Sequence, residues 1–208
     1  MADGAPTLHL ISGETHSLKD LIGVFRETME WVDVFYLRKK GLAPEELIYW
    51  ARSLLDEGGI PPERLMVNGD WEVAAAVGCA GVHLPETGPM PDVVRDEAKT
   101  RIKIGCSVHS VKTAQQRAAD GADYLFYGHI FSTPSKPGKT PRGVKALTQL
   151  AEAVPVPVMA VGGIKAQNIH LLAGSGCDGV AVISEVMDAE NPAVSAQKLK
   201  TAMRDGFR

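Results

Sequence analysis

This chain of 208 residues has few cysteines, no excess of one charge and no long apolar segment. Its three cysteines, Cys79, Cys106 and Cys177, lack CxxC spacing, which argues against a disulfide framework or a cysteine zinc site. We expect them to pack as small apolar groups. The 22 Lys and Arg residues against 25 Asp and Glu residues give a net charge of −3, so we expect no nucleic-acid partner.

The chain also lacks the segments that direct a protein to a membrane. No apolar run reaches the roughly 20 residues that span a bilayer. The first ten residues, MADGAPTLHL, do not have the charged and then apolar layout of a signal peptide. We therefore expect a cytoplasmic protein with no membrane partner, and the sequence leaves open whether it forms a homodimer.

Short apolar runs alternate with helical patterns along the whole chain, which is typical of parallel strands connected by helices. Eight strands are expected, at Leu8–Ile11, Val34–Leu37, Leu65–Val67, Gly81–Leu84, Lys103–Gly105, Tyr124–Gly128, Val158–Val161 and Val180–Ile183. Helical spacing of apolar residues is clearest in Leu18–Trp31, Pro44–Glu57, Val111–Ala119 and Val144–Ala153. We predict one (β/α)8 TIM-barrel domain over residues 1–208, with an open doubly wound sheet as the alternative.

In such a barrel the functional groups lie at the carboxyl ends of the strands and in the loops that follow. Gly162 and Gly163 follow the seventh expected strand, and Ser184 follows the eighth. Backbone N–H groups at these positions can bind an anion, so we predict a phosphate site there. The alternative is that the two glycines only permit a tight turn.

His129 follows an apolar strand end and is predicted to enter the barrel mouth, where an imidazole can transfer protons. His83 and His109 either face the mouth or pack as hydrogen-bonded residues. A metal site made of His83, His109 and Glu86 lacks diagnostic spacing, so we expect no metal. The segment from Phe131 to Arg142, rich in Pro, Gly and Lys, is predicted to be a functional loop.

Several short motifs are similar to those of one known family. They are YLRKK, VNGD, GVHLPE, GCSVHS, DYLFYGHIF, TPSK, AVGGI and GVAVIS, and they extend over nearly the whole chain. Together they resemble the thiamine phosphate synthase superfamily, and within it most closely the TenI group of thiazole tautomerases. This resemblance also implies a (β/α)8 barrel.

The resemblance includes two differences from the synthases. A synthase joins a pyrimidine diphosphate to a thiazole phosphate with magnesium held by acidic residues, but this chain has Gly69 and Gly88 at those two positions. Asp70 and Glu86 are nearby. Because magnesium requires oxygen ligands at defined positions, the differences favour a tautomerase, and so does His129 in the GHxF run.

The resemblance therefore implies an isomerase that aromatises a carboxythiazole phosphate tautomer without a cofactor, with His129 as the catalytic proton-transfer residue. Gly163, Ile183 and Ser184 would hold the substrate phosphate, and Gly162 would shape the turn. The substrate ring and carboxylate would be bound by Thr133, Ser135, Lys136, Arg38, Asn68 and Ser107. The alternatives are a magnesium-dependent thiamine phosphate synthase, a non-catalytic regulatory barrel that binds phosphate, or another phosphate-handling barrel isomerase or aldolase.

Overall fold

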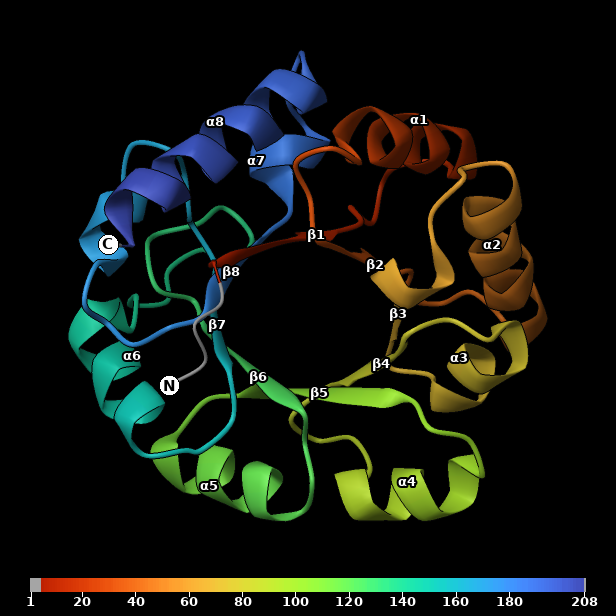
Figure 1. The fold of residues 1–208 in the computed structure, drawn as a ribbon, viewed down its shortest axis with the longest axis horizontal. Helices are drawn as coiled ribbons and strands as arrows, with labels where there is room; N and C mark the ends of the chain where they lie inside the picture. Colours follow the sequence, from red (N-terminus) through yellow and green to blue (C-terminus); the bar gives the residue numbers. More distant parts are fainter. Residues whose placement is uncertain (1–4, 208) are drawn as a thin grey trace.

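Eight parallel strands form a closed barrel in the computed structural model, which describes residues 5–207 (Figure 1). Each strand pairs with the next one along the chain, and β1 pairs with β8 in the register Leu8 with Val180. The strands are β1 Thr7–Ile11, β2 Val34–Leu37, β3 Leu65–Asn68, β4 Gly81–Leu84, β5 Lys103–Val108, β6 Tyr124–Gly128, β7 Val158–Val161 and β8 Gly179–Val182. The prediction of a (β/α)8 barrel is confirmed, and the open sheet is excluded by the β1–β8 pairing.

Helices surround the barrel as an outer ring in Figure 1. They are α1 Leu18–Thr28, α2 Pro44–Asp56, α3 Trp71–Val77, α4 Pro91–Ala98, α5 Val111–Ala119, α6 Gly143–Glu152, α7 Ser184–Met187 and α8 Pro192–Gly206, with 3₁₀ turns η1 Pro62–Arg64 and η2 Ile169–Leu172. Between β7 and β8 the described chain has only η2, and Gly174 and Gly176 in the segment after it adopt positive φ angles. The predicted domain also includes residues 1–4 and 208, which lie outside the described residues.

Alternation along each strand separates two apolar layers. On β6, Leu125 and Tyr127 pack outward against the helices, whereas Tyr124 and Phe126 belong to a smaller cluster inside the barrel. The three cysteines are unpaired and buried, as predicted, and burial raises the pKa of the Cys106 thiol to about 11. Among the described residues no helix is long and apolar enough to cross a membrane.

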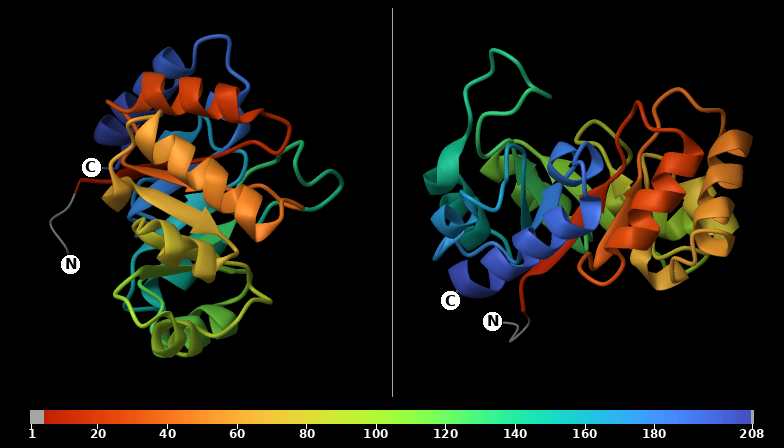
Figure 2. Two further views of the ribbon diagram at one scale, coloured as in Figure 1. Left: turned by 90° about the vertical axis from the view of Figure 1, so that its right-hand side faces the viewer. Right: turned by 90° about the horizontal axis from the view of Figure 1, so that it is seen from above.

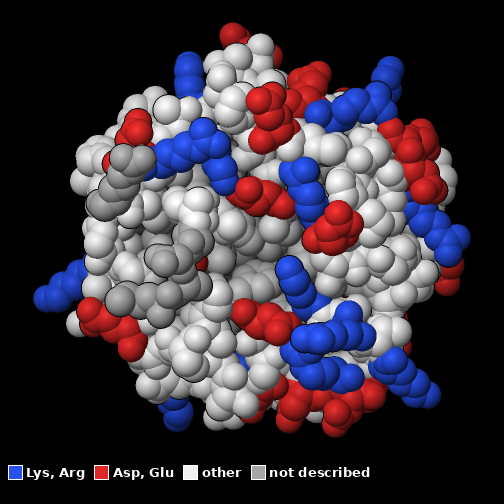
Figure 3. Space-filling model, viewed as in Figure 1, with Lys and Arg blue, Asp and Glu red and all other residues white. Residues whose placement is uncertain are grey.

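Basic and acidic side chains alternate on the face shown in Figure 3, in agreement with the small net charge. That face does not carry a broad surface of one sign. This face therefore lacks the broad basic surface that is typical of nucleic-acid binding.

Three aspartates fasten pairs of neighbouring strands at the end of the barrel where the strands begin. Each accepts a hydrogen bond from the backbone N–H of a residue in the strand before it: Asp33 from Leu8, Asp123 from Ile104 and Asp178 from Val158, at 2.6, 2.7 and 2.8 Å. The backbone N–H of each aspartate donates back to the carbonyl oxygen of the same residue. Each pair of bonds fixes the register between two strands.

Asp178→Ala is expected to lower the free energy of unfolding by about 1–2 kcal/mol, because the N–H of Val158 loses a charged acceptor. Denaturant unfolding measures the change. Asp205→Ala, a substitution of an exposed residue on α8, is the control and should change stability by less than about 0.5 kcal/mol. Equal effects of the two substitutions would show that the aspartate does not fasten the strands.

Two histidines lie inside the barrel, and burial lowers their pKa values from 6.5 to about 4 for His9 and about 3 for His83. Between pH 6.5 and 4 the unfolded chain binds protons on these imidazoles that the folded chain does not bind. Stability therefore falls as the pH falls through this window, by roughly 1.4 kcal/mol per pH unit for each imidazole.

Measuring the free energy of unfolding between pH 6.5 and 4.5 tests this dependence. His83→Gln should reduce the slope, whereas His170→Gln, at an exposed histidine, should leave it unchanged. If the free energy of unfolding depended on pH with the same slope in wild type and His83→Gln, the buried His83 imidazole would not be a cause of the pH dependence.

Candidate active site

The carboxyl ends of β5 to β8 surround a cavity of about 450 Å³. Figure 2 shows the loop between β6 and α6 projecting from this end of the barrel. Most of the predicted site residues line the cavity: Ser107, His129, Thr133, Ser135, Lys136, Gly162, Gly163, Ile183 and Ser184. Closure of the barrel brings them together although they come from four different strand ends.

Arg38 and Asn68 do not line this cavity. The Arg38 guanidinium pairs with Glu14 in the loop after β1, at 2.5 Å. The Asn68 amide donates to the carbonyl oxygen of His83 at 3.2 Å. Both residues are thus engaged with other parts of the protein, and their predicted contact with the ligand stays a prediction.

The two glycines after β7 lie against the chain after β6. A Cβ atom on Gly162 would come within 2.4 Å of His129 Cβ, and one on Gly163 within 2.4 Å of the Ser132 carbonyl oxygen. Their φ angles are +95° and +68°, which disfavours any residue with a side chain. Close packing therefore requires both glycines, whether or not their N–H groups also bind an anion.

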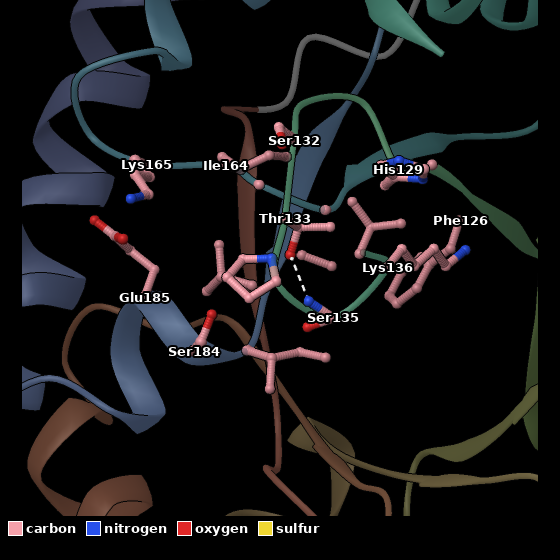
Figure 4. Close-up of a pocket in the computed structure, with 18 of the residues that line it drawn as sticks. Phe126, His129, Ser132, Thr133, Ser135, Lys136, Ile164, Lys165, Ser184 and Glu185 are labelled. Carbon is pink, nitrogen blue, oxygen red and sulfur yellow. Dashed lines mark hydrogen bonds between the residues drawn. The ribbon is translucent and has the colours of Figure 1, made fainter. Parts of the chain in front are cut away.

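The chain leaves β8 through Ile183 and enters the short helix α7 at Ser184. Val186 and Met187 donate their N–H groups to the Ile183 carbonyl oxygen, so the donors that this turn presents next to the cavity are the N–H groups of Ser184 and Glu185. In Figure 4 the Ser184 hydroxyl lies on the same side of the cavity as Glu185, with Thr133 and Ser135 of the β6–α6 loop nearby.

His129 lies in the cavity wall and is largely buried, with 6% of its surface exposed. It follows a cis Gly128–His129 peptide bond. Its Nε2 donates to the carbonyl oxygen of Lys139, 3.2 Å away, across the β6–α6 loop. This ring nitrogen thus ties the end of β6 to the β6–α6 loop.

Lys136 brings positive charge from the β6–α6 loop to the cavity (Figure 4). Its pKa is lowered, first by partial burial and then by the charges of Lys139 and Arg142. A cation whose charge is only partly neutralised by neighbours attracts an anionic ligand.

His109 and Glu86 form a pair beside the cavity that the sequence did not predict as ligand-binding. Glu86 accepts the backbone N–H of His109 at 2.8 Å, and its second oxygen lies 3.0 Å from His109 Nδ1. Partial burial lowers the pKa of His109, against the raising effect of Glu86. Other cavity residues that were not predicted include Ser132, Ile164, Lys165 and Glu185. Each lies within two residues of a predicted one in the sequence, and this proximity was the available signal.

The residues present do not fit a carboxylate-bound magnesium ion. Asp70 caps α3 by accepting the N–H of Val73 at 2.9 Å, and Glu86 accepts the N–H of His109 with one oxygen while its other oxygen lies 3.0 Å from His109 Nδ1. Gly69 and Gly88 provide no ligand. Within residues 5–207 no cluster of three or more His, Cys, Asp or Glu side chains could hold a metal.

Gly163→Ala is expected to displace the β6–α6 loop, because its Cβ would collide with the Ser132 carbonyl oxygen. Gly174→Ala is a matched control with the same φ of +68° and open space around its Cβ. The collision should lower the free energy of unfolding by about 1–3 kcal/mol beyond the control. Equal stabilities of the two variants would mean that the loop does not pack closely on Gly163.

Comparison with known proteins finds relatives of this chain that are named thiamine-phosphate synthase. The sequence model of the family described as thiamine monophosphate synthase matches residues 8–186. A thiamine-phosphate synthase of Bacillus thuringiensis is 34% identical over 202 residues, with 93% of this chain and 90% of the relative covered. That of Roseiflexus castenholzii is 38% identical over 167 residues, covering 78% and 72%. The solved thiamine phosphate pyrophosphorylase of Pyrococcus furiosus has a TM-score of 0.79 and 26% identity, and 98% of each chain is covered.

These relatives correct one expectation. The prediction of an isomerase, a thiazole tautomerase, is wrong, because the similar curated proteins are named thiamine-phosphate synthase, which is a transferase. The prediction depended on His129 and on two glycines in place of acidic residues, and one imidazole tied to the Lys139 carbonyl does not define a reaction. Similarity across nearly the whole chain shows instead that this protein belongs to the thiamine monophosphate synthase family.

Proposed function

We propose that the chain is a transferase of the thiamine-phosphate synthase type, which joins a pyrimidine diphosphate to a thiazole phosphate and releases diphosphate. The main support is the 34% identity to a protein of that name over 93% of the chain. The cavity at the strand ends supports the same proposal, because active sites of this fold lie on that face.

In this proposal the thiazole phosphate binds the N–H groups of Gly163, Ile183 and Ser184 and the Ser184 hydroxyl, while Gly162 shapes the turn. All four residues line the cavity. The glycines leave the backbone free of side chains at this point, so that a phosphate can approach it closely.

The leaving diphosphate needs donors and positive charge where its negative charge develops. Lys136 and Ser107 line the same cavity and supply an ammonium group and a hydroxyl. Thr133 and Ser135 on the loop complete this side, and the Ser135 N–H donates to the Thr133 hydroxyl at 3.3 Å (Figure 4). His129 holds the loop over the cavity, and its predicted role in proton transfer stays a prediction.

The lack of a fitting magnesium site favours a second candidate, a non-catalytic barrel that binds a phosphorylated ligand. The observations for it are Gly69 and Gly88 at the acidic positions and the engagement of Glu86 with His109. Folds persist when a reaction is lost, so binding without turnover is compatible with the same cavity.

Incubation of the protein with the pyrimidine diphosphate and the thiazole phosphate, with and without Mg²⁺, tests the two candidates. A transferase forms thiamine phosphate and diphosphate, and Lys136→Ala should lower kcat/KM about a hundredfold. Lys145→Ala, a substitution of an exposed lysine on α6 outside the cavity, is the control and should have little effect. Binding of the thiazole phosphate without any product would reject the transferase and support the non-catalytic barrel.

A further inference from the structure

A chain of hydrogen-bonded side chains crosses the inside of the barrel and ends at the cavity. Its members, in order, are Thr7, His9, Tyr36, Tyr124, His83 and Ser107. The successive distances between their polar atoms are 2.9, 2.8, 2.9, 3.2 and 2.9 Å. We call these six residues the interior relay. It starts at the beginning of β1 and reaches Ser107 in the cavity wall.

The inside of the barrel is built around this relay. A Cβ atom on Gly105 would lie 2.3 Å from the Tyr124 hydroxyl oxygen, so the glycine leaves the space that this phenol occupies. The His83 ring packs on Phe126 with centroids 4.2 Å apart. His9 and His83 are 5% and 2% exposed, so water cannot replace their partners.

Counting protons limits how the relay can be arranged. Tyr36 and Tyr124 each carry one hydroxyl proton, and their oxygens are 2.9 Å apart, so one must donate to the other. Both tyrosines face a histidine through its Nδ1 atom. If both donated outward to the histidines, no proton would remain between the two oxygens. If both accepted from the histidines, one buried hydroxyl proton would have no acceptor in the relay.

Every member of the relay has a hydrogen-bond partner only if all of its hydrogen bonds are donated in the same direction along it. This arrangement requires opposite tautomers in the two histidines. Either His9 carries its proton on Nδ1 and His83 on Nε2, or the reverse. Burial lowers both pKa values well below 6.5, so each imidazole stays neutral and keeps one proton at neutral pH.

The end at Thr7 decides between the two directions. In one of them the Thr7 hydroxyl donates to His9 Nε2, 2.9 Å away. In the other His9 donates to Thr7, and the proton of the half-buried threonine is left with the Met159 sulfur at 3.6 Å or with solvent. Only the first direction gives this proton an acceptor inside the barrel that is better than a thioether, so the first direction is favoured. Protons are then donated from Thr7 toward the cavity, and His83 Nε2–H donates to the Ser107 oxygen.

We propose that the interior relay holds Ser107 as a hydrogen-bond donor to an oxyanion of the ligand, with His83, Tyr124 and Tyr36 acting as positioning residues. Because His83 Nε2–H donates to the Ser107 oxygen, the Ser107 hydroxyl proton is not used in the relay and is free to point into the cavity. The ligand class that this arrangement fits is a phosphate or diphosphate. The inference rests on the proposed function for the identity of the ligand, but the direction of the relay does not depend on it.

Nitrogen NMR of the whole protein labelled with ¹⁵N-histidine tests the direction without any substrate. We expect His9 to be protonated on Nδ1 and His83 on Nε2, with no change between pH 6 and 8. Tyr124→Phe removes one hydroxyl and should release His83 from a single tautomer. The same tautomer in both histidines of the wild type, or the reversed pair, would overturn the proposal.

Calorimetric titration with inorganic pyrophosphate tests the effect on Ser107. Ser107→Ala should weaken binding about tenfold. Tyr124→Phe should weaken it several-fold in the wild type but by less than about 1.5-fold in Ser107→Ala, because the relay acts through Ser107. Tyr127→Phe, at a buried tyrosine on the same strand outside the relay and the cavity, is the matched control and should leave binding unchanged.

Additive effects of Tyr124→Phe and Ser107→Ala, or no pyrophosphate binding by the wild type, would overturn the proposal. Thermal unfolding identifies a variant that fails to fold, and Tyr36→Phe then replaces Tyr124→Phe in the same cycle. Non-additive effects of the two substitutions on pyrophosphate binding, together with a lack of synthase turnover, would reject the proposed function and leave the proposal about the relay in place. Synthase turnover with additive effects would support the proposed function and reject the proposal about the relay.

Discussion

Closure of the sheet by the pairing of β1 with β8 is the constraint on which the rest of the structure depends. It directs one set of side chains from every strand into a narrow interior and the other set toward the helices. It also brings the carboxyl ends of all strands to one rim. The cavity at that rim therefore combines residues from four strand ends that are far apart in the sequence.

The interior of this barrel is partly polar, which is costly unless each polar group has a partner. Two histidines and two tyrosines meet this condition by bonding to one another and to Thr7 and Ser107. A polar interior of this kind connects the packing of the barrel with the chemistry of its mouth. The same side chains that fill the core thus determine which way a cavity hydroxyl points.

In this protein a few single positions and the similarity of the whole chain indicate different reactions. His129 lies in the cavity wall as predicted. Gly69 and Gly88 stand at the two positions where the synthases have acidic residues, so no carboxylate is present there. These differences are real, but the relatives across 93% of the chain are named synthases. A few substitutions change which groups handle a diphosphate, whereas family membership reflects the entire pattern of strands and loops.

The eight strands and the strand ends that surround the cavity were determined by the sequence itself, because apolar periodicity is a local property of consecutive residues. Periodicity left an open sheet as the alternative, and only the pairing of β1 with β8 decided that the sheet closes. The glycines after β7 and the serine after β8 could be placed for the same reason. Only the tertiary structure decided the partners of the polar groups. Arg38 pairs with Glu14 instead of facing the cavity, and Tyr36 meets Tyr124, 88 residues away, because strand closure and register bring distant side chains together.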